Sequence, residues 1–395
     1  MGGDGCAHMY LLINKQLRTE LTRNQKAMTN DKKIVLTLDA GGTNFVFSAI
    51  CDNEEMVEPV SLKAVTTNTE GCLATLVQGF TTVKQRLDAE PMAISFAFPG
   101  PADYEHGVIG DLPDFPSFRG GVPLGPYLES VFGIPVFVNN DGNLFAYGEA
   151  LAGALPRVNQ ALQEAGCKRR YKNLVGITLG TGFGCGVVID KVLLTGDNGC
   201  GGDVWCMRNG MYPFVIAEES VSIRAVKRVY AEMSHEDASG LTPKDICEIA
   251  DGQRTGNKRA AQESFRQLGQ ATAAALVNVL NIVDGIVVMG GGVAGAARHI
   301  LPGMMEEFAR PVGTFSGHLM PTLQSEVYNF ENPTERAAFL DDKDVFLKVP
   351  HTDQQVLYCA QRKVAITVSE LGASKAINLG AYNFAIHQIE KQSYR

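Results

Sequence analysis

The stretch LTLDAGGTNFVFSAI, residues 36–50, has the pattern of a β-strand, a glycine turn and a second β-strand. The stretch GITLGTGFGCGVVID, residues 176–190, repeats this pattern about 140 residues later. In both, a threonine stands beside glycines between two apolar runs, as in a hairpin. The likeness is too short to prove a duplication, but it indicates two related halves of one molecule.

A third glycine-rich stretch, IVVMGGGVAGAA at residues 286–297, has the pattern of a buried strand, three glycines and the start of a small-residue helix. Glycines let the backbone approach a ligand, and successive N–H groups then form a concavity that binds anions. The chain has no GxxxxGK[ST] P-loop, and no GxGxxG between a strand and a helix with an acidic partner. The three stretches together therefore indicate a nucleotide held between two lobes.

Composition narrows the class of protein. A chain of 395 residues most often forms two domains. A formal net charge of −8 argues against a broad nucleic-acid footprint. Nine scattered cysteines indicate a reducing compartment more than a disulfide framework. Since no apolar run reaches membrane-spanning length and the first thirty residues do not form a secretory signal, we expect a cytoplasmic protein.

Strands alternate with helical segments along the chain, which indicates an α/β protein. Residues 242–245 have the signals of a helix start, residues 262–283 have helical periodicity, and a last helix is expected at about 374–388. We interpret the charged, irregular segment 325–358 as an insertion or elaborated loop. The basic cluster at 168–172 fits a solvated loop better than a partner site.

In its motifs the chain resembles the ROK family of sugar kinases, which have the actin-like ATPase fold. DAGGTN (39–44) is similar to the family's first phosphate motif, LGTGFG (179–184) to its second, and VMGGGV (288–293) to its adenosine motif. FPGP (98–101) resembles the turn near the sugar, and VNNDGNLFAYGEALAG (138–153) resembles the catalytic segment. The motifs follow one another in the family's order.

The resemblance implies a two-lobed α/β protein of the actin-like ATPase (ribonuclease H-like) fold, with its active site in the interdomain cleft. Residues 1–33 would form a polar extension, 34–155 the N-terminal lobe joined by a C-terminal helix at 374–391, and 156–373 the larger C-terminal lobe with its insertion. The implied activity is ATP- and Mg²⁺-dependent phosphorylation of a hexose or related sugar, of the glucokinase or hexokinase type. Such kinases are usually homodimers.

Asp141, within VNNDGN at 138–143, has two interpretations. Asn, Asp and Gly are ordinary turn residues, so the local pattern alone favours a turn. A sugar hydroxyl, however, must lose its proton as the phosphorus–oxygen bond forms, and a carboxylate within hydrogen-bond reach can accept that proton. By similarity, Asp141 is the general base and Asn140 beside it contacts the sugar.

The resemblance assigns the other site residues as well. Asp39 would hold Mg²⁺ through water, although it is equally well explained as a turn residue. Glu218 is expected at a sugar-binding position, with Glu219 as the alternative. The residues expected to contact ATP are Asp39, Gly41, Gly42, Thr43, Asn44, Gly180, Thr181, Gly182, Gly290, Gly291 and Gly292. Those expected to contact the sugar are Gly100, Asn140, Cys200, Asp203 and Glu218.

One segment departs from the family pattern. Members typically carry ExGH after the second phosphate motif, and many add a cysteine-rich zinc motif. In GCGGDVWCMRNG (199–210), Cys200 occupies the Glu position and Asp203 the His position. Cys206 lacks the close cysteine spacing of a tetrahedral zinc site, so we predict no structural zinc. Trp205 would pack either on a sugar face or in the core.

The departure leaves two rival functions open. A sugar-responsive transcriptional regulator would need a DNA-binding module, and residues 1–33 are too short for a winged helix-turn-helix. A non-catalytic sugar sensor is supported by the changes at Cys200 and Asp203. Because Asp141 and the glycine turns are intact, we favour an active kinase with an altered sugar preference. Neither a nucleic-acid nor a membrane partner is expected.

Overall fold

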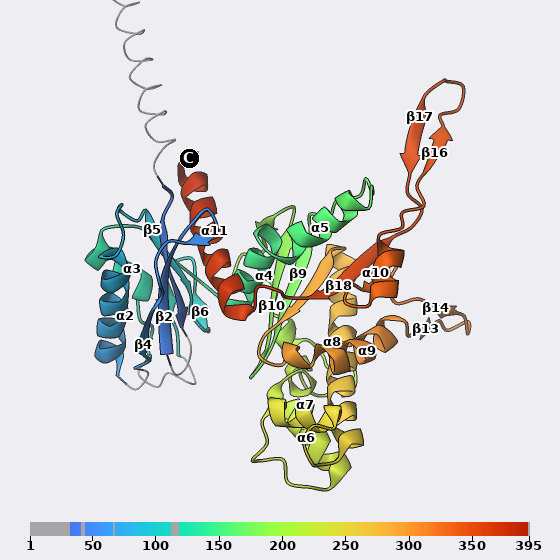
Figure 1. Cartoon of the computed structure of the whole chain (residues 1–395), viewed down its shortest axis with the longest axis horizontal. Helices are drawn as coiled ribbons and strands as arrows, with labels where there is room; N and C mark the ends of the chain where they lie inside the picture. Colours follow the sequence, from blue (N-terminus) through green and yellow to red (C-terminus); the bar gives the residue numbers. More distant parts are fainter. Residues whose placement is uncertain (1–31, 41–43, 66–67, 112–117, 394–395) are drawn as a thin grey trace, which may run out of the picture.

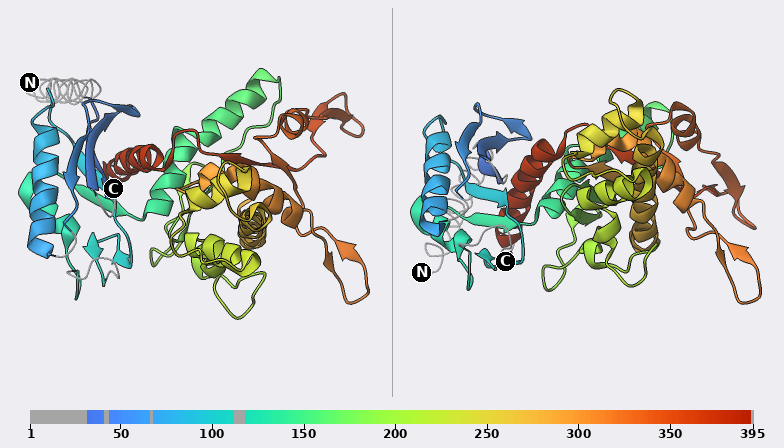
Figure 2. Two further views of the ribbon diagram at one scale, coloured as in Figure 1. Left: turned by 60° about the horizontal axis from the view of Figure 1, so that its bottom comes forward. Right: turned by 90° about the horizontal axis from the view of Figure 1, so that it is seen from below.

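The computed structural model describes residues 32–40, 44–65, 68–111 and 118–393. Gly41, Gly42, Thr43 and most of the expected N-terminal extension lie outside these ranges. The chain forms two α/β lobes, and the C-terminal helix α11 (Ala373–Ser393) lies between them (Figures 1 and 2). No helix in the described ranges is long and apolar enough to cross a membrane.

The N-terminal lobe is built on a sheet of order β3-β2-β1-β5-β8, with β4 also paired to β2. The first hairpin is antiparallel, whereas β1, β5 and β8 run parallel. A small hairpin, β6–β7, follows β5. The elements are β1 (Val35–Ala40), β2 (Asn44–Cys51), β3 (Glu54–Glu55), β4 (Val60–Lys63), α2 (Thr69–Lys84), β5 (Ala93–Ala97), β6 (Ala102–Asp103), β7 (Val108–Ile109), α3 (Leu124–Phe132) and β8 (Val136–Asn139).

Side-chain alternation along β1 gives this sheet two buried faces. Leu36 and Leu38 point into a core shared with α2 and α3, where Phe47, Phe80 and Phe96 pack together. The neighbouring residue Val35 points to the other face and packs against α11. Because successive strand residues face opposite sides, a continuous apolar run is what a strand covered on both faces requires.

The C-terminal lobe repeats this arrangement in a sheet of order β11-β10-β9-β12-β18-β15. Again a glycine-turn hairpin, β9–β10, is antiparallel and the strands beyond it run parallel. Helices α6 to α9 cover one face, and α4 and α5 cover the other. The elements are α4 (Asp141–Leu151), α5 (Ala154–Glu164), β9 (Leu174–Leu179), β10 (Phe183–Ile189), β11 (Val192–Leu193), α6 (Ile223–Ser234), α7 (Pro243–Asp251), α8 (Lys258–Val283), β12 (Ile286–Gly290), α9 (Ala297–Phe308), β15 (Glu326–Asn329), α10 (Pro333–Phe339) and β18 (Lys363–Val368).

Helices α4 and α11 cross at close range and hold the two lobes together. A Cβ added at Gly148 of α4 would overlap the carbonyl oxygen of Ala376, and one added at Gly380 of α11 would overlap that of Leu144. Two glycines facing each other's helix backbone let the axes approach more closely than larger residues allow. Since α4 lies on the second sheet and α11 on the first, this crossing joins the lobes.

The hairpins around both glycine turns, the buried strand before the three glycines and the last helix are confirmed. So is the helix start at Thr242, which forms a capping box with Asp245. The interpretation of residues 325–358 as an inserted loop is wrong in part, because β15 is an edge strand parallel to β18. Its four residues are too few to show a strand pattern among charged neighbours.

The interpretation of the basic cluster at 168–172 as a solvated loop is correct for part of it, since Lys168, Arg170 and Lys172 are exposed but Arg169 is not. Arg169 is only 18 % exposed and lies 3.6 Å from the carboxylate of Asp342. Lys168 stacks 4.8 Å from the ring centroid of Phe346. The cluster therefore packs against a segment about 170 residues away along the chain, which no local pattern in the sequence reveals.

We expect Gly380→Ala to lower the free energy of unfolding by about 3 kcal/mol, because a methyl group there forces α4 and α11 apart. Denaturant titration of the full chain measures this. Gly240→Ala is the matched control, since an added Cβ at Gly240 meets nothing within 4 Å. Equal stability of the two variants would contradict the close crossing.

Candidate active site

Three of the sequence motifs meet at one edge of the N-terminal sheet. Strands β1, β5 and β8 are parallel neighbours, so their carboxyl ends lie side by side. Asp39 lies at the end of β1, Phe98 follows β5, and Asn140 follows β8. The Phe98 N–H donates to the Asn139 carbonyl oxygen over 3.0 Å. Ligands of open α/β sheets bind at this edge.

Asp141 is the first residue of α4, and its neighbour does the capping. The Asn140 side-chain oxygen accepts from the Gly142 N–H at 2.8 Å and from the Asn143 N–H at 3.4 Å. One Asp141 oxygen accepts from the Gly142 N–H at 2.9 Å. Since Asn140 already caps the helix, the turn-forming role does not require the carboxylate of Asp141, whose side chain is exposed to solvent.

The surroundings raise the pKa of Asp141. Protein atoms around its carboxylate replace much of its water shell, although solvent still reaches the side chain, and this desolvation is the largest effect. The negative charge of Asp39 acts in the same direction, while the Gly142 N–H acts against both. A carboxylate with a raised pKa is a stronger proton acceptor once ionised.

Tyr104, which the motifs did not identify, lies beside these groups. Its hydroxyl donates to the Phe98 carbonyl oxygen over 3.0 Å. Burial raises the pKa of Tyr104, and the nearby carboxylates of Asp141 and Asp203 add to this, whereas a hydrogen bond with Asn140 opposes it. The only sequence signal was its place in the hairpin directly after FPGP.

Asp203, from the second lobe, also lies at this site, because its negative charge raises the pKa of Tyr104. It also raises the pKa of Cys185, which reaches about 12, although burial is the larger cause there. Gly202 before it has φ +94°, and an added Cβ would lie 3.0 Å from the Cys185 carbonyl oxygen. The departing segment therefore still brings a polar side chain close to Tyr104.

Two neighbours of Asp203, Cys200 and Trp205, are exposed to solvent. Cys200 is exposed, and its sulfur lies 3.4 Å from the carbonyl oxygen of Asn198. Trp205, in a short 3₁₀ helix (Val204–Cys206), is 43 % exposed and is not a core residue. Gly100 lies near Tyr104, since a Cβ there would be 3.0 Å from its hydroxyl.

Glu218 lies at the second glycine turn. One carboxylate oxygen accepts from the Phe183 N–H at 3.0 Å, and the other lies 3.2 Å from the Arg224 guanidinium. An added Cβ at Gly182 would lie 2.6 Å from Glu218. Arg224 also pairs with Glu219 at 3.2 Å. In this structure Glu218 thus supports the expected phosphate turn.

The second and third glycine elements pack against each other. Gly291 has φ +90°, and an added Cβ would lie 2.5 Å from the Leu179 carbonyl oxygen at the end of β9. The same oxygen accepts from the Val293 N–H at 3.0 Å. Thr181 and Gly292 are exposed, and an added Cβ at Gly292 meets nothing within 4 Å. These open backbone surfaces are where a nucleotide could lie.

Two groups of side chains bear on metal binding. Asp39 is half-buried at the strand edge and could hold Mg²⁺ through water. In the described residues, the one group of at least three potential ligands within mutual reach is Cys247, Asp251 and His299. Arg298 already pairs with Asp251, so this group does not fit a cation. The absence of a structural zinc stays a prediction.

Comparisons with known proteins agree with the sequence motifs. Residues 35–320 match the ROK family. The chain is 52 % identical to the glucokinase from Parabacteroides distasonis, whose crystal structure it matches with a TM-score of 0.81 over 91 % of this chain and 99 % of that one. It is 26 % identical to the glucokinase of Thermotoga maritima over 69 % of this chain and 86 % of that protein. It is also 31 % identical to an N-acetyl-D-glucosamine kinase of Vibrio cholerae, over 43 % and 51 %.

We expect Gly291→Ala to weaken binding of MgATP about tenfold or more and to destabilise the protein by about 2 kcal/mol. The substitution adds strain at a positive φ and a clash with the Leu179 backbone. Calorimetric titration with a non-hydrolysable ATP analogue measures the binding. Gly292→Ala, in open space with no such φ, should bind like the wild type; equal loss in both variants would refute the argument.

Proposed function

The chain belongs to the ROK family, and we propose that it is an ATP-dependent kinase of a hexose or related sugar. Its two-lobed α/β structure is the actin-like ATPase fold. The observation that carries the proposal is the carboxylate of Asp141, which the helix cap does not require and which stands at the strand edge beside Asn140, Tyr104 and Asp203. The glucokinases to which the chain is similar favour glucose as the substrate.

In the proposed mechanism, the sugar lies in the cleft against Asn140, Tyr104 and Asp203. MgATP lies along the sequence motif at 41–44 and the backbone at 180–182 and 290–292. As the sugar oxygen bonds to the γ-phosphorus, its proton passes to Asp141 and the bond from the phosphorus to ADP breaks. Mg²⁺ held through Asp39 would neutralise phosphate charge. Closure of the lobes would exclude water and limit wasteful hydrolysis.

ADP release from MgATP across glucose, mannose, fructose, allose, N-acetylglucosamine and N-acetylmannosamine tests the proposal. We expect turnover that depends on sugar and is fastest with glucose. If no sugar supports turnover while sugar and ATP still bind, the non-catalytic sensor is the better description, and Cys200 and Asp203 are the residues that explain it. We expect the reaction in the cytoplasm, in keeping with the scattered cysteines.

The raised pKa of Asp141 predicts the pH dependence. A general base works only when ionised, so kcat/KM should fall as the pH drops through the raised pKa, above the ordinary value of 3.8. Asp39→Asn removes a charge that raises this pKa, and should move the acid limb to lower pH whatever it does to the maximal rate. An acid limb that stays in place, or moves upward, would contradict the coupling.

Kinetics of Glu218→Gln distinguish its two proposed positions. If Glu218 supports the phosphate turn, the KM for ATP should rise about fivefold while the KM for the sugar changes less than twofold. Glu219→Gln, which lies beside the same arginine, serves as the control. A rise in the sugar KM alone would instead make Glu218 a sugar contact, as the family resemblance implies.

We also propose that the chain forms a homodimer through two hairpins, β13–β14 (Val312–Gly313, Leu319–Met320) and β16–β17 (Val345–Lys348, Gln355–Tyr358). Both project from the C-terminal lobe, away from the N-terminal lobe (Figures 1 and 2). A lone two-stranded hairpin is marginally stable in water, and exposed apolar patches mark interfaces. The exposed apolar side chains are Val312, Phe315, Leu319, Met320, Val345, Phe346, Leu347, Val356, Leu357 and Tyr358.

Light scattering during size-exclusion chromatography tests the dimer. The wild type should elute at twice the chain mass of 42.6 kDa, and Leu347→Glu/Leu357→Glu should elute as the monomer. Phe214→Glu, at an exposed position on another part of the lobe, is the control. A monomeric wild type would contradict the proposal, as would a double variant that remains dimeric.

A further inference from the structure

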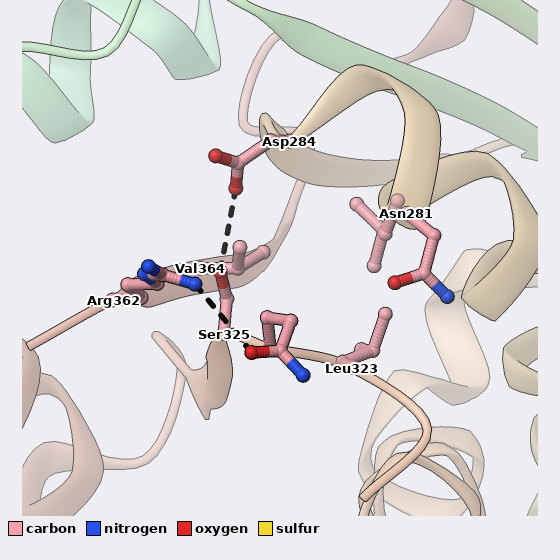
Figure 3. A pocket seen from close by; sticks show the side chains of 8 residues that line it. Asn281, Asp284, Leu323, Ser325, Arg362 and Val364 are labelled. Atoms are coloured by element: carbon pink, nitrogen blue, oxygen red, sulfur yellow. Dashed lines mark hydrogen bonds between the residues drawn. The ribbon is translucent and has the colours of Figure 1, made fainter.

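A polar pocket lies at the edge of the second sheet opposite to the glycine turns. A cavity of about 340 Å³ opens where the parallel strands begin, beside Asn173 before β9, Asp284 before β12 and Lys363 at the start of β18. A second cavity of about 200 Å³ adjoins it and shares Asp284, Ser325 and Arg362. Figure 3 shows Asp284 and Arg362 on either side of Ser325 in this second part.

The pocket is separate from the candidate active site. Strands β9 and β12 lead from it to the turns at 180–182 and 290–292. A strand of six residues spans roughly 20 Å, so an anion in this pocket is about that far from the expected ATP phosphates. Its polar groups take no part in the proposed phosphoryl transfer.

Five cationic side chains line the larger cavity, although the net charge of the chain is −8. Two of the five are already paired with groups of the protein itself. Lys363 is buried and donates to the carbonyl oxygens of Ala338 at 2.9 Å and Asp341 at 2.7 Å. Arg169 donates to the Gln361 carbonyl oxygen at 2.6 Å, and both cations lie within 3.8 Å of Asp342. These two hold the chain after α10 against the sheet.

The other three cations keep donors available. Arg170 uses one nitrogen for the carbonyl oxygens of Cys167 and Arg169, and Arg362 makes one long contact of 3.5 Å to Gln324. Throughout the described ranges, no ion pair involves Arg170 or Arg362. Lys172 lies 3.3 Å from Asp190, but both are mostly exposed and such pairs are weak. Free guanidinium groups fit the geometry of phosphate.

The adjoining cavity offers a different chemistry. Besides the shared Arg362, its polar side chains are those of Asn281, Asp284, Gln324 and Ser325, and the Ser325–Asp284 hydrogen bond is long at 3.4 Å. Carboxylate, amide and hydroxyl groups bind sugar hydroxyls, and apolar side chains beside them can contact a sugar ring. The apolar part of this lining is Leu280, Leu323 and Val364.

From this division between two adjoining cavities, we propose that together they form a pocket that binds a phosphorylated sugar. The phosphate would lie against Arg170, Lys172 and Arg362, and the sugar hydroxyls would face Asp284 and its neighbours. The proposal rests on the pocket alone and does not require the chain to be a kinase. Its ligand class includes the product of the proposed reaction, so the pocket would be a second site for that product.

Calorimetric titration of the full chain with glucose 6-phosphate, without ATP, tests the proposal. We expect a binding event that Arg170→Gln/Arg362→Gln weakens at least about tenfold, since each arginine supplies charge-assisted hydrogen bonds. Both side chains lack ion pairs, so the variant should stay folded, which thermal unfolding checks. Arg228→Gln/Arg310→Gln removes two surface arginines of the same lobe elsewhere and should bind like the wild type.

Titrations with inorganic phosphate and with glucose test the two parts of the pocket one at a time. Inorganic phosphate should bind at least about tenfold more weakly than glucose 6-phosphate, and its binding should be lost in the same arginine variant. Saturating glucose should leave this binding event in place, which distinguishes it from any binding in the cleft. Unchanged affinity in the arginine variant, or equal affinity for both phosphates, would overturn the proposal. Either result would leave sugar-dependent ADP release, and hence the proposed function, untouched.

Discussion

The close packing of α4 is the constraint on which the rest of the structure depends. Its glycine Gly148 lies against α11, which covers the N-terminal sheet. Its other side rests on β9 and β10, where an added Cβ at Gly176 or Gly186 would meet Ala146 at 2.7 Å. One helix is thus held by both lobes, and its first residue is Asp141. The position of the carboxylate at the junction of the two lobes follows from how the lobes are joined.

The glycines of the second motif accordingly have two separate roles. Those at 180–182 form the open turn between β9 and β10, whereas Gly176 and Gly186 leave room for α4 on the sheet behind it. The same division holds at the third motif, where Gly291 is required by its positive φ and Gly292 is open. Glycine-rich sequence therefore combines ligand binding with close backbone packing, and only the structure separates the two.

Local periodicity in the sequence predicted the hairpins and the strand before the three glycines. The two-lobed fold, with Asp39 and Asp141 in one cleft, was implied by the resemblance to the ROK family. Neither identified Tyr104 beside Asn140, or the contact of Glu218 with the Phe183 N–H, because both depend on contacts between segments far apart in the sequence. Arg169 of the basic cluster was misjudged for the same reason, since Asp342 is its distant partner.

The central claim is that Asn140 caps α4 and thereby leaves Asp141 free to accept a proton. Asp141→Asn tests it directly, because the amide keeps the oxygen that accepts from the Gly142 N–H and removes the base. We expect sugar affinity within about threefold of the wild type, unchanged thermal stability, and a kcat lower by about 10²- to 10⁴-fold. A variant that keeps more than about a tenth of the wild-type kcat, or that loses sugar binding and rate in equal proportion, would contradict the account.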